Sequence, residues 1–231
     1  MLPVGSVLVD FDGTACLHDV AEHLLIEFGD STWEALDRAW EAGDLGGREV
    51  LARQAAMLSG RTDELLRFAL EHCPIDPTFG PFVEWCRWRD VGVTLVSDGF
   101  GFYIEPLLRA AGVGDVGIVT NTWSDAGSPR LAFDRGMASC RWCGTCKVAA
   151  VREARELSGP VAFVGEGGSD RYGARAADLV FAKDRLPSLC EADGVPYVRW
   201  QDFEDVRRVL SDGTMPHGPV EPDRCPGMDG S

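Results

Sequence analysis

The chain has 231 residues, of which 45% are hydrophobic and 26% are charged, and it carries a formal net charge of −15. This length supports one sizeable core with a smaller appended domain, and the composition is ordinary for a soluble globular protein. The acidic excess argues against a general nucleic-acid-binding protein, because such proteins need clustered lysine and arginine. It does not exclude a phosphorylated substrate, since a divalent cation and one or two local bases can reverse the charge inside a pocket.

The N-terminal segment 1–9 lacks the charged start and the long apolar stretch of a secretory signal. No window approaches the ~20 consecutive apolar residues that cross a bilayer. We therefore expect a cytoplasmic protein with no membrane partner. In that location the eight cysteines are expected to be thiols or metal ligands rather than disulfides.

The first predicted element is a short buried strand over residues 6–9, followed by Asp10-Phe11-Asp12-Gly13-Thr14. Side chains two apart on an extended backbone point the same way, so both carboxylates face one pocket at the carboxyl end of the strand. A magnesium ion would offset their repulsion. Asp10 could then attack phosphorus, while Asp12 protonates the leaving group and later activates water. The alternative interpretation is a strand that ends in an ordinary Asp-Gly turn.

Residues 17–70 show helical periodicity and no convincing strand. We interpret residues 17–77 as a small helical domain inserted after the first strand. Trp33 and Trp40 share one helix face, and we expect this aromatic stripe to form the interior of the inserted domain rather than a substrate cage.

Short apolar runs that are typical of strands recur further along the chain, with helical segments between most of them. The runs cover residues 91–96, 116–120, 161–164, 179–182 and 197–199, and the helical segments include 80–90, 103–111 and 147–157. This alternation predicts a doubly wound parallel α/β core, which we place at residues 1–16 and 78–210. We expect a hairpin or loop near the sheet edge in residues 122–138, and a disordered tail in residues 211–231.

Polar residues follow two of these later strands. In Ser97-Asp98-Gly99, a hydroxyl and free backbone N–H groups can bind a phosphate oxygen. In the glycine-rich segment 165–170, Glu166 can reach a metal directly, and Asp170 can bind the metal or a ligating water. Each segment by itself is more ordinarily explained as a turn with capping acids.

Lys147 begins the predicted helix at 147–157. Its ammonium can neutralise both the nucleophile and the transferring phosphoryl group. A lysine considered alone is more often a solvated surface residue. The combination of two acids, a hydroxyl, a base and two further acids is what indicates a phosphoryl-transfer site.

Together these segments resemble the haloacid dehalogenase superfamily of phosphatases over about residues 5–210. The resemblance implies a Rossmann-like core with a helical cap inserted between the first two motifs. Asp10 and Asp12 match the nucleophile and the acid/base of that superfamily, and Ser97 and Lys147 match its phosphate-binding hydroxyl and its lysine. The resemblance also implies a magnesium cofactor, with the ligands Asp10, Asp12, Glu166 and Asp170.

Within the superfamily, the chain is similar to the phosphoserine-phosphatase-like branch, and particularly to the methionine-salvage phosphatases of 2-hydroxy-3-keto-5-methylthiopentenyl-1-phosphate. Residues 97–104, 140–147 and 170–181 carry this likeness. It implies hydrolysis of a small phosphate monoester through an aspartyl-phosphate. Phosphoserine, phosphocholine or phosphoethanolamine phosphatases, a phosphotransferase, and a catalytically weak binding protein of the same fold stay open as alternatives.

One residue departs from the family pattern, which usually has Gly-Asp where this chain has Gly165-Glu166. Glutamate keeps the charge but is one methylene longer, and magnesium requires near-octahedral ligands at ~2.1 Å. We therefore predict reduced or altered metal dependence, with some tolerance for manganese.

Two further groups of residues have open roles. Arg48 is the leading candidate for contacting the substrate beyond its phosphate, with Gln54 on the same helix, although a solvated arginine is at least as plausible. Cys140, Cys143 and Cys146 form C-x-x-C-x-x-C, which could bind zinc or an iron–sulfur cluster with a further ligand, or act as a redox module. We favour a loop that positions Lys147.

Overall fold

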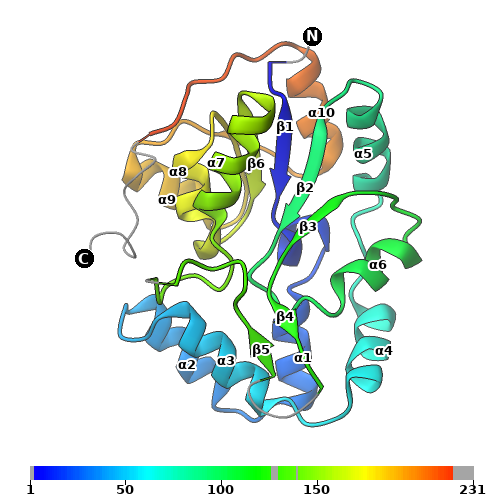
Figure 1. The fold of residues 1–231 in the computed structure, drawn as a ribbon, viewed down its shortest axis with the longest axis vertical. Helices are drawn as coiled ribbons and strands as arrows, with labels where there is room; N and C mark the ends of the chain where they lie inside the picture. The colour runs from blue at the N-terminus through cyan, green and yellow to red at the C-terminus, as the bar shows by residue number, and fades with distance from the viewer. Residues whose placement is uncertain (1–2, 126–129, 139, 221–231) are drawn as a thin grey trace.

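The computed structural model describes residues 3–125, 130–138 and 140–220. Its main sheet has six parallel strands in the order β3-β2-β1-β6-β7-β8. The strands are β1 (Ser6–Val9), β2 (Gly92–Val96), β3 (Gly117–Val119), β6 (Val161–Gly165), β7 (Leu179–Ala182) and β8 (Val198–Arg199). The predicted doubly wound parallel sheet is confirmed, and β1 lies inside it between β2 and β6 (Figure 1).

Helices cover both faces of this sheet, which explains why its central strands are continuously apolar. On one face Leu8 and Phe163 pack with α7 (Lys147–Ser158), α8 (Arg171–Ala176) and α9 (Leu186–Asp193). On the other face Val7 and Val9 pack with α5 (Phe79–Arg87), α6 (Ile104–Ala110) and α10 (Phe203–Ser211). Alternate residues of β1 therefore belong to different halves of the core.

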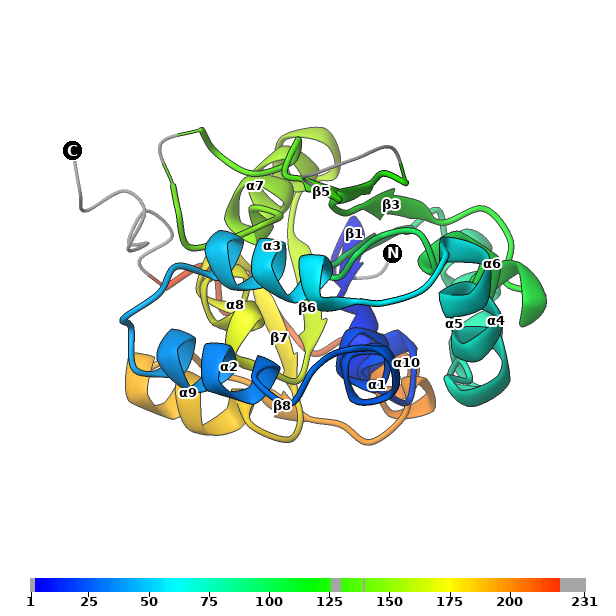
Figure 2. The ribbon, with the colours of Figure 1, turned by 90° about the horizontal axis from the view of Figure 1, so that it is seen from below.

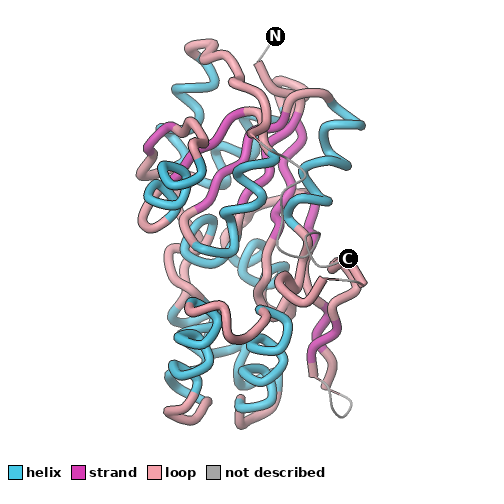
Figure 3. Tube along the Cα trace, turned by 90° about the vertical axis from the view of Figure 1, so that its left-hand side faces the viewer, coloured by secondary structure: helices cyan, strands magenta, loops and turns pink. Residues whose placement is uncertain are grey.

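Four helices form a separate layer beyond the carboxyl ends of the strands, and we call them the cap. They are α1 (Val20–Phe28), α2 (Trp33–Glu41), α3 (Gly47–Met57) and α4 (Thr62–His72). In Figure 1 they lie below the sheet, and Figure 3 shows the same two-part arrangement from the side. A bridge between Cys16 and Ile75 joins the two ends of the inserted segment, and the domain limits at 17 and 77 stay a prediction.

The expected hairpin in residues 122–138 is present as β4 (Thr122–Trp123) paired antiparallel with β5 (Leu131–Ala132). It is separate from the main sheet and contacts the cap. The Trp123 indole donates to the Thr62 hydroxyl at 2.8 Å, and the Arg130 guanidinium donates to the Leu58 carbonyl at 2.9 Å. Residues 126–129 of this segment lie outside the described residues.

The described part of the C-terminal tail contacts the core. The N–H groups of His217 and Gly218 donate to the Asp178 carbonyl, and that of Val220 donates to the Arg175 carbonyl. These backbone hydrogen bonds hold residues 217–220 against the core, and residues 221–231 lie outside the described residues. The disorder expected for residues 211–231 stays a prediction. Within the described ranges, no helix has the length and apolar character that a membrane span requires.

Candidate active site

The acidic motif at the N-terminus lies at the carboxyl edge of the sheet because of where β1 is paired. Val9 is in register with Leu95 of β2 and with Val164 of β6. Asp10, Ser97 and Glu166 follow these strands almost directly, so they meet at one edge. This is the crevice in which open α/β sheets bind ligands.

The backbone after β1 turns sharply over residues 11–15, and Gly13 makes that turn possible. Its φ is +69°, a conformation that favours glycine. A Cβ atom at this position would also lie 3.2 Å from Cγ of Glu166. The turn thereby brings Asp12 and Glu166 into one site while leaving space for both.

Lys147 is the first residue of α7, and its ammonium lies between two carboxylates. Nζ donates to Asp10 and to Asp170, both at 2.6 Å, and to the Ser169 hydroxyl at 3.1 Å. Only 3% of Lys147 is exposed. Burial lowers the pKa of Lys147, but the charges of Asp10 and Asp170 outweigh that effect and raise it, so the ammonium stays charged.

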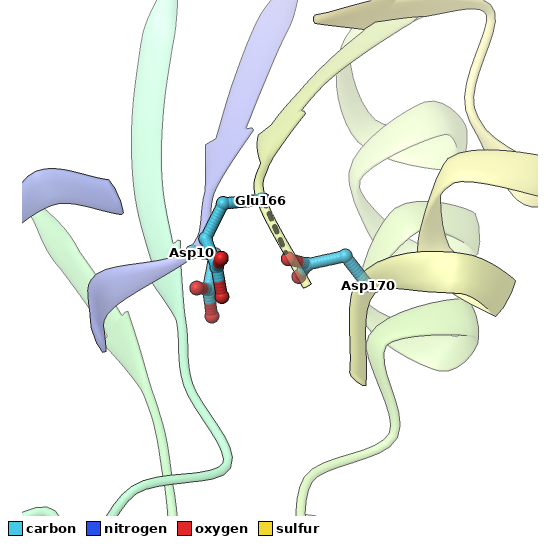
Figure 4. Close-up of side chains that lie close together, drawn as sticks. All are labelled: Asp10, Glu166 and Asp170. Atoms are coloured by element: carbon cyan, nitrogen blue, oxygen red, sulfur yellow. Dashed lines mark hydrogen bonds between the residues drawn. The ribbon is translucent and has the colours of Figure 1, made fainter. Parts of the chain in front are cut away.

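Three carboxylates converge beside this lysine. Oxygen atoms of Asp10, Glu166 and Asp170 all lie within 4.8 Å of one another. Figure 4 shows Asp10 and Glu166 at the ends of β1 and β6, with Asp170 approaching from the helical segment beyond β6. The second oxygen of Asp170 accepts the N–H groups of Glu166 at 2.9 Å, drawn dashed in Figure 4, and of Gly167 at 3.0 Å. These bonds fix the orientation of the Asp170 carboxylate.

The same three carboxylates form a donor set that fits a divalent cation. Burial, and then the charge of Asp170, raise the pKa of Glu166 to about 7 and hold that of Asp10 well above its ordinary value. A cation would relieve this repulsion. Carboxylate oxygens are the hard ligands that magnesium prefers, so the residues present fit the predicted cofactor.

Asp12 has a different environment from this cluster. Its carboxylate accepts from the Tyr103 hydroxyl at 3.1 Å, the Ser97 hydroxyl at 3.2 Å and the Val20 N–H at 2.9 Å. Burial nevertheless raises the pKa of Asp12 to about 7. The carboxylate of Asp12 is not part of the acidic cluster, since these three donors hold it, and its role as a metal ligand stays a prediction.

The segment Ser97-Asp98-Gly99 approaches Asp12 closely. Ser97 is 1% exposed, and its hydroxyl also accepts the Gly99 N–H at 2.9 Å. A Cβ atom on Gly99 would lie 2.6 Å from Asp12 Oδ2 and 2.2 Å from the Tyr103 hydroxyl, so this position needs glycine. Asp98 and Gly99 line the adjoining cavity. Ser97 is buried and is not among the described residues that line it, so phosphate binding by its hydroxyl stays a prediction.

The sequence of the chain is also similar to the sequences of known proteins. The sequence model of the haloacid dehalogenase-like hydrolase family matches residues 7–175. The chain belongs to this family. The expected resemblance is therefore confirmed.

Two curated relatives show the extent of the similarity. A 2-hydroxy-3-keto-5-methylthiopentenyl-1-phosphate phosphatase of Brevibacillus brevis is 28% identical over 206 residues, covering 87% of this chain and 92% of that protein. The bifunctional enzyme MtnB/MtnX of Bacillus licheniformis is 27% identical over 218 residues, covering 89% of this chain. The chain spans 49% of the length of that bifunctional protein.

Solved structures share the fold at lower identity. A haloacid dehalogenase family hydrolase of Salmonella enterica has a TM-score of 0.71 at 16% identity, covering 91% of this chain and 73% of that one. A phosphoserine phosphatase with an analogue of the phospho-aspartyl intermediate has a TM-score of 0.65 at 17% identity, covering 90% and 98%. The expected enzyme class, a phosphoric monoester hydrolase, agrees with these relatives.

Three residues of this haloacid dehalogenase-like hydrolase support the site without having been singled out from the sequence. Tyr103 holds Asp12, and the Asn121 side chain donates to the carbonyls of Asp98 at 2.7 Å and Gly99 at 3.1 Å. The Thr145 N–H donates to the Asp98 carboxylate at 2.5 Å. These residues cannot be recognised from the spacing of a motif, because each binds a partner that is far away in the sequence.

A cavity of about 420 Å³ lies between the carboxyl edge of the sheet, which we call the catalytic edge, and the cap. Figure 2 shows the cap helices α2 and α3 from below, the side on which the cap lies in Figure 1. Trp33, Trp40 and Trp142 line it together with apolar residues of α1 and α3. Trp33 packs against the hydrophobic core, as predicted for the interior of the cap, and both Trp33 and Trp40 also contribute to the cavity wall. Trp40 also contacts the core, since a Cβ atom on Gly168 would lie 3.0 Å from its ring.

The guanidinium of Arg48 binds backbone carbonyls, and its contact with a substrate stays a prediction. The guanidinium donates to the carbonyls of Cys143 at 2.7 Å and Met137 at 2.6 Å, and Arg48 is not among the described residues that line the cavity. These bonds direct Arg48 toward the cysteine loop. Gln54 does line the cavity, and its amide donates to Asp37 at 2.7 Å.

The three cysteines of the C-x-x-C-x-x-C segment do not form a metal-binding group with the other described residues. The group of possible metal ligands among the described residues consists of Asp10, Glu166 and Asp170. None of these three cysteines is in a disulfide. Cys146 caps the start of α7, where its sulfur accepts the Ala149 N–H at 3.4 Å. This placement agrees with our preferred interpretation, a loop that positions Lys147.

Proposed function

We propose that this chain hydrolyses a small-molecule phosphate monoester through an aspartyl-phosphate on Asp10, with magnesium held by Asp10, Glu166 and Asp170. The observation that carries the proposal is the ammonium of Lys147, 2.6 Å from both Asp10 and Asp170. A buried lysine bound to two acids at a strand end can offset the charge of a nucleophile and of an incoming phosphate.

The proposed reaction has two steps. One carboxylate oxygen of Asp10 attacks phosphorus while the bond to the leaving alcohol breaks, and Asp12 gives its proton to that alcohol. Asp12, now ionised, takes a proton from the water that attacks the aspartyl-phosphate, which releases phosphate and restores Asp10. Tyr103 and Ser97 keep Asp12 in place for both transfers. A bound magnesium ion would supply shielding of the phosphoryl charge.

We infer that the preferred substrate is 2-hydroxy-3-keto-5-methylthiopentenyl-1-phosphate, the substrate in the name of the Brevibacillus brevis relative described above. The cavity supports this choice. Leu25, Leu51 and the three tryptophans offer apolar and aromatic surface, on which a methylthio group packs favourably.

The cavity also argues against phosphoserine. Among the described residues that line it, Arg185 is the basic one, and it is ion-paired with Glu41. Asp19, Glu22 and Asp37 line the cap side. A substrate carboxylate would lie among these acids without a free cation, which is unfavourable.

The same lining favours a second candidate, a phosphate ester of an amino alcohol such as phosphocholine or phosphoethanolamine. A cationic group is attracted both by acids and by the faces of tryptophan rings. Trp33, Trp40, Asp19 and Asp37 lie on the wall that such a group would reach.

The test is phosphate release, with magnesium, from a generic aryl phosphate, the methionine-salvage substrate, phosphocholine and phosphoserine. We expect turnover of the aryl phosphate, a higher kcat/KM for the methionine-salvage substrate, and the lowest value for phosphoserine. Asp10→Asn should abolish all turnover, whereas Asp44→Asn, an exposed acid outside the site, should not. Absence of aryl phosphate hydrolysis would favour the catalytically weak binding protein. The cytoplasmic location stays a prediction.

A further inference from the structure

The loop before Lys147 contains a pair of cysteines in contact with each other. The Cys143 thiol hydrogen-bonds to the sulfur of Cys140, and the Trp142 N–H also donates to that sulfur at 3.4 Å. Cys140 is 6% exposed, and Cys143 is half-buried. The pair is therefore preorganised and accessible from solvent on one side.

The environment of Cys140 differs from that of the other buried thiols. The hydrogen bond from Cys143, helped by backbone N–H groups and the charge of Arg48, lowers the pKa of Cys140 to about 5. Burial instead raises the pKa of four other cysteines above the ordinary value, namely Cys16, Cys73, Cys86 and Cys190. Because the thiolate is the reactive form, oxidation should select Cys140 among these thiols.

This loop also connects the cap to the catalytic edge. On the cap side, Arg48 of α3 binds the Cys143 and Met137 carbonyls, and its backbone N–H donates to the Arg141 carbonyl at 3.3 Å. On the core side, Thr145 binds the Asp98 carboxylate and the chain continues into Lys147. A change in the loop is therefore transmitted to both walls of the cavity.

We propose that Cys140 and Cys143 form a reversible disulfide when the protein meets a hydroperoxide, and that this modification lowers catalytic activity. With hydrogen peroxide as the oxidant, the thiolate of Cys140 attacks one peroxide oxygen, the O–O bond breaks, and the products are a sulfenic acid and hydroxide, which is protonated to water; an organic hydroperoxide would release an alcohol instead. The Cys143 sulfur then attacks the Cys140 sulfur, which releases a second water and forms the S–S bond. The two thiols together lose two electrons and two protons to the peroxide.

The effect on activity follows from geometry, and this part of the proposal rests on the proposed phosphatase function. A disulfide requires an S–S distance of about 2.05 Å, much shorter than a thiol hydrogen bond. Closing the pair must shift residues 140–143, and with them the Cys143 carbonyl held by Arg48 and the Trp142 ring that lines the cavity. A displacement of ~1 Å near a catalytic group can reduce the rate by up to about a hundredfold.

The position of Arg141 makes the disulfide directly measurable, because trypsin cleaves between the two cysteines. The full-length protein is treated with near-stoichiometric hydrogen peroxide, free thiols are alkylated, and the digest is kept non-reducing. We expect peptides 136–141 and 142–147 to be linked and to separate on reduction. The link should be absent in Cys143→Ser, which distinguishes Cys143 from Cys146, and retained in the control Cys190→Ala.

Activity toward an aryl phosphate is measured on the same samples. We expect kcat/KM to fall about tenfold or more in parallel with the linked peptides, and to recover with dithiothreitol. Cys143→Ser should resist this reversible loss. Each of three results would overturn the proposal: peptides that stay unlinked after oxidation, a link within 142–147 alone, or a complete link with unchanged activity. The peptide result does not depend on turnover, so failure of the phosphatase function gives a different outcome from failure of the disulfide.

Discussion

Lys147 and Asp10 are separated by 137 residues in sequence, yet the lysine ammonium lies 2.6 Å from the aspartate carboxylate. The same ammonium contacts Asp170 at an equal distance. All three side chains are nearly inaccessible to solvent. This bridge therefore joins the end of β1 to the start of α7 and to the turn after β6.

Replacement of Lys147 by methionine should reduce both stability and activity. The variant leaves two buried carboxylates without their cation, a change that typically costs about 3–5 kcal/mol in unfolding free energy. Chemical denaturation measures this loss, and phosphate release should fall to background. Arg67→Met, which changes an exposed residue, is the matched control and should retain the stability and the activity of wild type. A Lys147→Met protein as stable as wild type would contradict the proposed role of the bridge.

Removal of the Tyr103 hydroxyl should change the pH dependence of turnover. The first step needs protonated Asp12, whose pKa is raised to about 7, so kcat should decrease as the pH rises above about 7. The Tyr103 hydroxyl lowers the pKa of Asp12 by binding its ionised form. In Tyr103→Phe that pKa rises, so the protonated acid should persist and the decrease should begin at higher pH.

The Tyr103 measurement is a pH–rate profile with magnesium at saturation. We expect a fall in kcat of roughly twofold to tenfold at neutral pH, the size of one hydrogen bond. Tyr197→Phe, which removes an exposed hydroxyl bound to Glu191, should leave the profile unchanged. If kcat began to decrease at the same pH in Tyr103→Phe and in wild type, this function of Tyr103 would be excluded.

Shortening Glu166 to aspartate should alter metal preference. Glu166 lies in the acidic cluster, and one methylene changes how its carboxylate meets a small cation with strict octahedral geometry. We expect the ratio of magnesium to manganese activity to be higher in Glu166→Asp than in wild type. Turnover across a metal series measures it, with the exposed Glu156→Asp as control. Identical metal profiles would reject the prediction.

Two carboxyl groups, those of Asp12 and Glu166, should also make metal-free protein less stable at higher pH. The pKa values of Asp12 and Glu166 are both raised to about 7, against about 4 in an unfolded chain. The stability that these protonated groups contribute is fully present below about pH 4 and is lost as the pH rises through about 7. Wild type should therefore lose thermal stability between pH 5 and 8 relative to Glu166→Gln.

Magnesium should reverse that loss. At about 100 times its Kd, a ligand of the folded state adds ~2.7 kcal/mol, which for a chain of this size raises Tm by roughly 5–10 °C. Thermal unfolding with and without magnesium at pH 8 measures the effect. A Glu166→Gln protein that gains as much as wild type would show that Glu166 does not contribute to the metal site.

Much of the catalytic edge was predictable from local sequence. Short β-branched runs followed by Asp10, Ser97 and Glu166 predict parallel strands with polar residues at their ends, and parallel strands place those ends together. The contact between Lys147 and Asp10 follows from the same rule, because the helix that precedes β6 begins at that edge. The acidic cluster of Asp10, Glu166 and Asp170 was expected for this reason.

Other parts of the site were decided by tertiary structure. Tyr103 reaches Asp12, Arg48 is directed to the cysteine loop, and Trp33 and Trp40 face the cavity. Helical periodicity shows which residues share a face, but it does not show what that face meets once the cap packs over the sheet. The sequence by itself therefore determined the strand ends and their chemistry, while the docking of cap on core decided the cavity, since docking depends on contacts between segments far apart in the chain.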